Sequence, residues 1–325
     1  MALEFLTNSI GLIGRYVLVP LWFGLLLFVL LEILSRKKGV SLSQEFHTRS
    51  FAVSTAIIFG WLVYFLLPSN LYLPMETLTV KFVVGLFMVI LTFQYTVFLI
   101  AELFSMQKTI ISLGIGAGLI RSTIAASVVS KMCAEDEGAN YDGAAAIMIS
   151  KATLAIRNFV IIMVVGIWLN IFAVPPMFFT VPMLILFISC LVTGIVFYKK
   201  GSGGEVDFQP VSLKSSFIFL VLFLVMYYFA LGVIGYAGII GLYALSGAAG
   251  FLYGGAHLFI IASLLFTQQV TAEAALVAAL AVTMGSMFAD LPYTFFAGAR
   301  GLTKLTLIAS IIPLALAIIS LLYFI

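Results

Sequence analysis

Four ionisable side chains interrupt long apolar stretches of this sequence of 325 residues, and they are the first candidates for chemistry: Arg121, Lys151, Arg157 and Asp290. A charged side chain is costly to bury in a lipid bilayer, so inside membrane segments such residues usually face a cavity, a solute or a partner charge. Three basic groups against one acid favour an anionic solute. The chemistry that these residues suggest is the binding of a small solute or ion.

Two of these charged residues, Lys151 and Asp290, each have polar residues on the same face of their predicted helix. Lys151 and Asn158 are seven residues apart, which places them on nearly the same face of one helix. Thr283, Ser286 and Asp290 follow one another at i, i+3 and i+7 on a second helix. Because the two helices occupy corresponding positions in the two halves of the chain, we expect their polar faces to converge.

The residues after Asp290 predict a helix interruption. Leu291 and Pro292 follow the acid, and because proline lacks a backbone donor, we expect a kink that frees a carbonyl oxygen close to the carboxylate. Two structural alternatives stay open. The charges could form an ion pair that only orients helices, such as Arg157 with Asp290, or Lys151 could extend its amine to the membrane interface.

Two apolar stretches rich in small residues, 114–127 and 246–257, mark where we expect the site. The first contains the polar run Arg121, Ser122 and Thr123. The second ends at His257. Serine and threonine hydroxyls at a helix break can bond the backbone groups that the break frees, or a ligand.

The spacing of the two stretches indicates a duplication. Aligning Gly118 with Gly247 gives an offset of 129 positions, and the Ala-rich segments that follow align with an offset of 130. Interrupted hydrophobic segments at matching positions of two halves are typical of transporter binding sites. Glycines four apart, at 114/118 and 250/254, also have a simpler interpretation, since small residues let helices approach closely in lipid.

The composition requires a membrane protein. Hydrophobic residues make up 63% of the chain and charged residues 9%, whereas about 25% of the residues of a soluble domain are charged. Backbone groups in lipid must pair within helices or a closed barrel, and the long continuous apolar runs favour helices. We therefore predict an all-α integral membrane protein, multi-pass, in the cell (cytoplasmic) membrane.

We predict ten apolar segments joined by short loops, approximately at 16–34, 51–67, 80–101, 110–130, 144–167, 178–198, 215–234, 237–265, 272–297 and 302–325. The predicted organisation is two leading transmembrane helices in 1–79, repeat one in 80–198, a cytoplasmic linker in 199–214 and repeat two in 215–325.

Loop charges distinguish two topologies. If all ten segments cross, the lysines and arginines of the loops divide into seven inside and six outside. If the two glycine-rich segments instead re-enter on the side from which they came, eleven lie inside and two outside. Because positively charged short loops stay in the cytoplasm, we favour the eight-crossing model, in which the two repeats are inverted.

Several function classes lack their motifs. The sequence has no zinc motif, no phosphate-binding loop and no nucleophile elbow, so we predict no enzyme activity, no cofactor and no metal. Cys133 and Cys190 show no metal-ligand or redox spacing and are predicted to be small core or loop residues. The acidic loop 135–142 is predicted to be a solvated connector, with attraction of a divalent cation as the alternative. A net charge of +3 suggests no nucleic-acid partner.

From about Val80 to Ile319 the chain resembles the polytopic membrane domain of unknown function that follows an MgtC/SapB-type domain in many bacterial proteins. The motifs that carry the resemblance lie at 118–123, 144–157, 211–216 and 241–247. The resemblance implies a prokaryotic multi-pass membrane protein and carries over Ser122, Thr123 and Arg157. It implies little about activity, because that family is uncharacterised.

The chain also departs from this family pattern. The second break of the family reads Ser-Gly-x-x-Asp-x-Asp, and both acids are missing from the sequence that begins at Ser246. Arg121 replaces a small polar residue, and a basic residue expected near Met287 is absent. The first 79 residues supply two plain spans in place of an MgtC-type domain. The sequence therefore predicts a divergent, stand-alone member in which cation chemistry based on those acids is doubtful.

The sequence predicts a transporter or facilitator of a small solute or ion, with its site at the interface of the two repeats. The alternative is a non-transporting scaffold or regulator of another membrane complex. Expected partners are the lipid bilayer and the solute, and a homo-oligomer is possible. The candidate site residues are Arg121, Ser122, Thr123, Lys151, Arg157, Asn158, His257, Ser286 and Asp290.

Overall fold

The computed structural model describes residues 110–120, 123–168, 176–202, 213–266 and 268–324, together with scattered positions between 57 and 88. The chain divides into two compact units, of which one comprises 1–100 with 211–220 and the other 101–210 with 221–325. All of the candidate site residues that the structure describes belong to the second unit. The predicted leading helices lie largely outside the described residues, as do Arg121 and Ser122.

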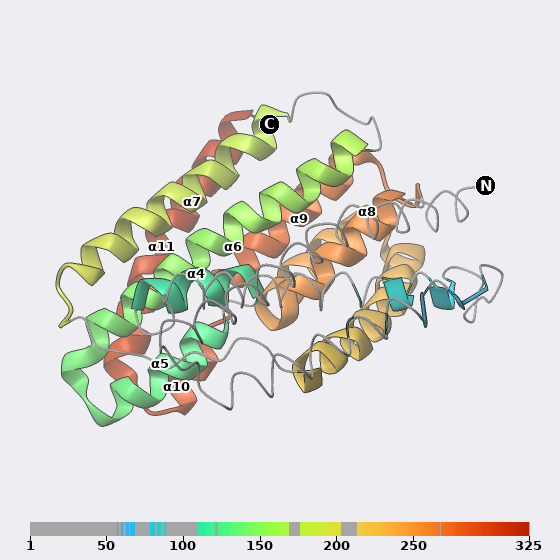
Figure 1. Cartoon of the computed structure of the whole chain (residues 1–325). Coiled ribbons are helices and arrows are strands. Elements are labelled where there is room, and N and C mark those ends of the chain that lie inside the picture. Colours follow the sequence, from blue (N-terminus) through green and yellow to red (C-terminus); the bar gives the residue numbers. More distant parts are fainter. Residues whose placement is uncertain are drawn as a thin grey trace, which may run out of the picture. The chain divides into compact units, whose positions relative to one another are not determined.

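Every regular element described from Ile110 onward is a helix (Figure 1). In chain order these are α4 (Ile110–Ile120), α5 (Thr123–Glu135), the short 3-10 helix η3 (Glu137–Ala139), α6 (Asn140–Trp168), α7 (Met177–Tyr198), α8 (Leu213–Phe266), α9 (Ala272–Ser286), α10 (Leu291–Phe296) and α11 (Arg300–Phe324).

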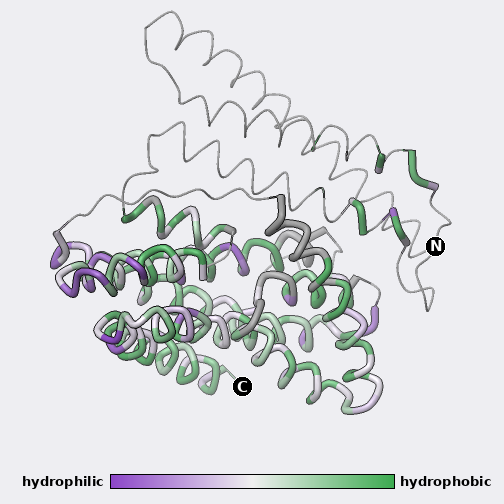
Figure 2. Tube along the Cα trace, turned by 90° about the horizontal axis from the view of Figure 1, so that it is seen from below, coloured by the Kyte–Doolittle hydropathy of each residue, from purple (hydrophilic) through white to green (hydrophobic). Residues whose placement is uncertain are grey.

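Five described stretches are long and apolar enough to cross a membrane: Glu137–Met163, Met177–Tyr198, Leu224–Phe251, Ala272–Phe296 and Arg300–Phe324. Apolar residues run along most of the length of these helices (Figure 2). Their outward faces keep large apolar side chains exposed, among them Ile188 and Val192 on α7 and Ile312 and Ile319 on α11. Exposed apolar faces of this size are typical of helices that face lipid. Together with the five stretches they bear out the prediction of an all-helical, multi-pass membrane protein.

Helix α6 is the central element of the second unit and contacts α4, α5, α7, α9 and α11. Small residues make this packing possible, since Ala144, Ala145 and Ala146 are completely buried near its start. A Cβ atom on Gly194 of α7 would lie only 3.1 Å from the backbone nitrogen of Ile149. The close approach of backbones is the usual packing solution in lipid, where helices gain little from hydrophobic association.

The first glycine-rich stretch forms two helices in place of one continuous segment. Helix α4 ends at Ile120 and α5 begins at Thr123. Gly114 of α4 faces Ala146 of α6 and Gly118 faces Ser150, so α4 and α6 run in the same direction. Helix α5 is joined to α6 by the short helix η3.

The second glycine-rich stretch lies within α8, which is not straight. Gly238 has φ +62°, a left-handed conformation that glycine adopts easily; it is the second residue of the predicted segment 237–265. Farther on, Ser246 Oγ lies 3.0 Å from His257 Nε2. In a straight helix residues eleven apart are separated by about 16 Å, farther than these two side chains reach together. The chain must therefore bend sharply between Ser246 and His257.

The predicted interruption before Pro292 is confirmed. Helix α9 ends at Ser286 and α10 begins at Leu291. Between them, the amides of Met287, Phe288 and Ala289 each bond the carbonyl three residues back, which is 3-10 geometry rather than α-helical geometry. Asp290 occupies the last position before α10.

Candidate functional site

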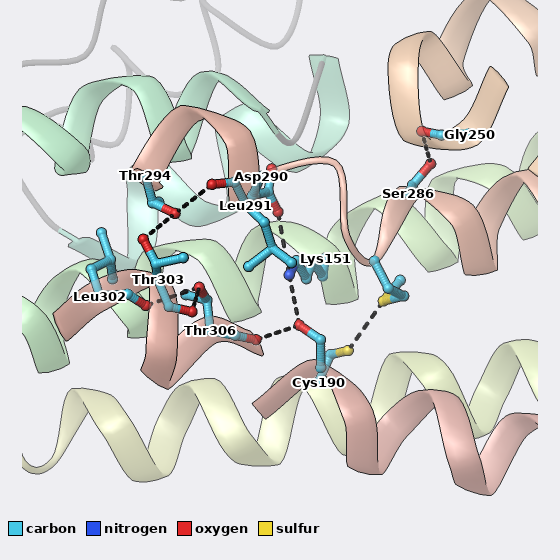
Figure 3. A network of polar contacts seen from close by, with 12 residues as sticks. Lys151, Cys190, Gly250, Ser286, Asp290, Leu291, Thr294, Leu302, Thr303 and Thr306 are labelled. Atoms are coloured by element: carbon cyan, nitrogen blue, oxygen red, sulfur yellow. Dashed lines mark hydrogen bonds and ion pairs between the residues drawn. The ribbon is translucent and has the colours of Figure 1, made fainter. Parts of the chain in front are cut away.

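A buried ion pair joins α6 to the interruption between α9 and α10 (Figure 3). Lys151 Nζ lies 3.4 Å from Asp290 Oδ2, and both side chains are 0% exposed. The ammonium also donates a hydrogen bond of 2.8 Å to Ser310 Oγ on α11, and Ser310 in turn donates to the carbonyl of Thr306. Three elements therefore meet at one enclosed cation.

A second polar contact joins the same two helices. Asn158 Nδ2 donates to Thr283 Oγ1 at 3.0 Å, with both side chains buried. The Nε and Nη2 groups of Arg157 donate to Asn158 Oδ1 at 3.2 and 2.9 Å. Arg157 Nη1 reaches the carbonyl of Leu119 on α4 at 3.2 Å. This network therefore ties α4, α6 and α9 together.

The predicted convergence of the two polar helix faces is confirmed. Lys151 meets Asp290 and Asn158 meets Thr283. Along α6 the residue number rises from 151 to 158 while the partner's number falls from 290 to 283, so α6 runs antiparallel to α9. Two structural alternatives are corrected. The first was an ion pair of Arg157 with Asp290. Asp290 instead pairs with Lys151, because the Arg157 side chain is directed to α4. Lys151 does not extend to the interface, because its amine is enclosed by protein.

The remaining candidates lie at other positions. Ser286 donates to the carbonyl oxygens of Gly250 and Val282, at 3.1 and 2.8 Å, and so fastens α9 to the bent part of α8 (Figure 3). His257 is buried beside Ser246. Thr123 is buried at the start of α5. None of these three contacts the Lys151–Asp290 pair in the described structure, and Arg121 and Ser122 are outside it.

Sequence reasoning missed the polar stripe of α11. Thr303 Oγ1 donates to Thr294 Oγ1 of α10 at 2.9 Å (Figure 3). The Thr306 hydroxyl donates to the carbonyl of Thr303, and the Ser310 hydroxyl donates to the carbonyl of Thr306. Their spacing of i, i+3 and i+7 is the same signal that identified Thr283, Ser286 and Asp290. This spacing could have predicted that Ser310 lies on the side of α11 that faces the site.

The acidic loop was predicted to be a solvated connector, and this holds for its exposed residues Glu135 to Glu137. It is wrong for Asp142, which is 0% exposed. Asp142 Oδ2 accepts hydrogen bonds from the backbone nitrogen and the hydroxyl of Ser202, at 2.9 and 2.8 Å. The carboxylate therefore anchors the turn that follows α7 to the first turn of α6, where the helix dipole also favours a negative charge.

The cysteines are packing residues, as predicted. Both Cys133 and Cys190 are free and buried. Cys190 Sγ lies 3.9 Å from Met287 Sδ, next to the interruption after α9 (Figure 3). Within the described part of the chain, no group of three or more His, Cys, Asp or Glu side chains is placed to hold a metal ion.

Comparison with known proteins adds one finding. Residues 88–298, more than half of the chain, match the model of a family described as Domain of unknown function (DUF4010). No curated protein and no solved structure matches the chain. The match agrees with the expected resemblance to an uncharacterised membrane family, and it does not address an association with MgtC-type domains.

Proposed function

The chain belongs to the family described as Domain of unknown function (DUF4010), and from the site we propose that it transports a small solute or ion, or facilitates its passage, across a membrane. The single observation that carries this proposal is the Lys151–Asp290 pair. Ionisable residues inside membrane segments most often mark solute or ion routes, and here the pair sits where a membrane helix is interrupted.

A purely structural role explains the pair less well. Taking both charges out of water costs several kcal/mol per ion, and replacing such a pair with apolar residues of similar volume is often neutral or stabilising. Three separate elements supply the polar groups of this site. Lys151 Nζ comes from α6, Ser310 Oγ from α11, and Asp290 Oδ2 from the interruption between α9 and α10. Discontinuous helices that present charges near the middle of the membrane are the usual construction of transporter sites.

We propose further that the site lies between two inverted repeats, and four glycine contacts support this. Gly114 and Gly118 face Ala146 and Ser150, and Gly250 and Gly254 face Val282 and Ser286, so each glycine meets a residue 32 positions later. Gly114 and Gly250 are 136 positions apart, as are Gly118 and Gly254. These contacts favour an offset of 136 over the offsets of 129 and 130 from the sequence alignment.

The antiparallel course of α6 and α9 is what two inverted repeats require. In this proposal the chain reverses its direction between α4 and α5. This reversal is the re-entrant element of repeat one, in 80–198, and the bend of α8 is that of repeat two, in 215–325. The eight-crossing topology, the cytoplasmic linker in 199–214, the cell membrane as location and the lack of enzyme activity remain predictions alongside it.

The test is flux in proteoliposomes that contain the purified full chain. Currents on solid-supported membranes would be recorded for Na⁺, K⁺, chloride, phosphate and short carboxylates, with an internal pH dye to detect coupled protons. We expect one class of solute to give flux, and Lys151→Met and Asp290→Asn to reduce it at least tenfold. Lys304→Met is the matched control, because Lys304 is exposed on α11.

A double variant separates transport from helix orientation. Lys151→Met with Asp290→Leu removes both charges together, so it should fold and yet show no flux if the pair acts on the solute. A folded double variant with wild-type flux would assign the pair a structural role. A folded wild-type protein that moves none of these solutes, and that copurifies with a stable membrane partner, would support the scaffold alternative instead.

A further inference from the structure

The imidazole of His257 has a nitrogen that the described structure leaves without a partner. The side chain is 0% exposed. Its Nε2 lies 3.0 Å from Ser246 Oγ, whereas Nδ1 has no hydrogen-bond partner in the described part of the chain. Buried polar groups of native proteins are nearly always hydrogen-bonded, so an orphaned one points to a ligand or water that completes it.

The bond to Ser246 favours one of the two positions of the ring proton. The Ser246 hydroxyl makes its one described hydrogen bond to His257, and a neutral imidazole has one donor and one acceptor nitrogen. If the hydroxyl donates to Nε2, the ring proton is on Nδ1. The other tautomer would leave the serine proton without an acceptor in addition to the unpaired Nδ1. The geometry therefore assigns Nδ1–H as a buried donor.

His257 lies at the end of a sharp bend within α8 and not in a straight stretch of the helix. The bend between Ser246 and His257 brings residues eleven apart into contact, and Gly250 and Gly254 inside it lie against Val282 and Ser286 of α9. Broken helices in membranes concentrate their unpaired polar groups where a ligand binds. The donor thus lies at a distortion of a membrane helix, and distorted helices are where transporters place their binding groups.

The proposed duplication indicates the charge of the ligand. With the offset of 136 that the glycine contacts give, the position in repeat one that corresponds to His257 is Arg121. Arg121 and His257 therefore place a nitrogen donor at corresponding positions of the two proposed repeats, and the guanidinium of Arg121 is always positively charged. Two equivalent donors favour a ligand whose atoms accept hydrogen bonds and carry negative charge.

We infer that the bent segment of α8 from Ser246 to His257 binds a small oxyanion, and that His257 Nδ1–H donates a hydrogen bond to one of its oxygen atoms. Ser246 is the positioning residue, because its hydroxyl holds the ring in the tautomer that can donate. This inference rests on the proposed function in one respect, namely that the oxyanion is the transported solute. Binding itself does not require transport.

The test reads the imidazole directly. The chain has two histidines, His47 and His257, so a His47→Gln protein labelled with ¹⁵N-histidine reports only His257. We expect a protonated Nδ1 and an unprotonated Nε2 in detergent at neutral pH, and a shift of the Nδ1 resonance on addition of phosphate, acetate or succinate. Sodium chloride at matched ionic strength is the control. A protonated Nε2, or no shift with any of the three oxyanions, overturns the inference.

Two amide variants provide a matched comparison. The side-chain nitrogen of His257→Asn lies near the position of Nδ1, whereas that of His257→Gln lies near Nε2. We expect His257→Asn to keep oxyanion binding and His257→Gln to weaken it at least tenfold, measured by the rise of the thermal unfolding midpoint with ligand. The opposite order, or equal binding by both, contradicts the inference.

The two proposals can fail separately. Oxyanion binding that depends on His257, in a protein that gives no flux in proteoliposomes, would keep the binding site and refute transport. Flux of a cation that is unaffected by both His257 variants would keep transport and refute the oxyanion site.

Discussion

Removing one member of the Lys151–Asp290 pair should destabilise the protein far more than removing both. Asp290 Oδ2 lies 3.4 Å from Lys151 Nζ, and both side chains are fully enclosed. Breaking a buried pair leaves an uncompensated charge, at a typical cost of about 3–5 kcal/mol. We therefore expect Lys151→Met and Asp290→Leu each to lower the free energy of unfolding by about that amount.

The double variant leaves no orphaned charge, and the neighbouring Ser310 keeps its bond to the carbonyl of Thr306. The expected loss is therefore only about 0–2 kcal/mol, which covers imperfect packing of the new side chains. If the single losses added, their sum would be about 6–10 kcal/mol, so the coupling free energy between the two sites should amount to several kcal/mol.

Reversible unfolding in mixed detergent micelles, followed by tryptophan fluorescence and circular dichroism, gives the four free energies of this cycle. Lys304→Met controls for the loss of a lysine from an exposed position. Single variants that each cost less than about 1 kcal/mol, with additive effects in the double variant, would refute the reasoning, because two charges that do not sense each other cannot form an enclosed pair.

Three further predictions follow from contacts elsewhere. Gly118→Val should lower the free energy of unfolding by about 1–3 kcal/mol through overpacking, because a Cβ atom would collide with the carbonyl of Ser150. Gly232 has open space around it, so the control variant Gly232→Ala should not destabilise the protein. Asp142→Asn should weaken the anchor of Ser202 by about 1.5–3 kcal/mol and increase protease cleavage after α7; unchanged cleavage would contradict the anchor. Burial raises the pKa of the Cys133 thiol to about 11, so its maleimide labelling in the folded protein should be slow at pH 7 and accelerate as rising pH forms the thiolate; fast labelling at pH 7 would contradict this burial.

Periodicity and composition predicted much of the site. The spacing of Lys151 with Asn158, and of Thr283 with Asp290, was sufficient to predict that two helix faces converge, because helix geometry fixes which residues share a face. Pro292 predicted the end of α9 for an equally local reason. These predictions required only backbone geometry and no knowledge of how helices pack.

Partner choice could not be predicted in the same way. Whether Asp290 pairs with Lys151 or with Arg157 depends on the rotation and depth of α6 against α9, and a difference of one turn reverses the answer. The same uncertainty hid the contacts of Gly114 and Gly250 with residues 32 positions later, from which we propose the register of a duplication. Asp142 was taken for a solvated residue because its partner, Ser202, is 60 positions away.

The Lys151–Asp290 pair also bears on how the protein responds to voltage. Opposite charges 3.4 Å apart form a unit with no net charge, and a membrane potential does work only on net charge that moves, about 2.3 kcal/mol per elementary charge per 100 mV. Motion of α6 together with the α9–α10 interruption would therefore carry this pair through the field at almost no electrical cost. Any voltage dependence of the protein must then arise from other charges, from the solute, or from a step in which Lys151 and Asp290 separate.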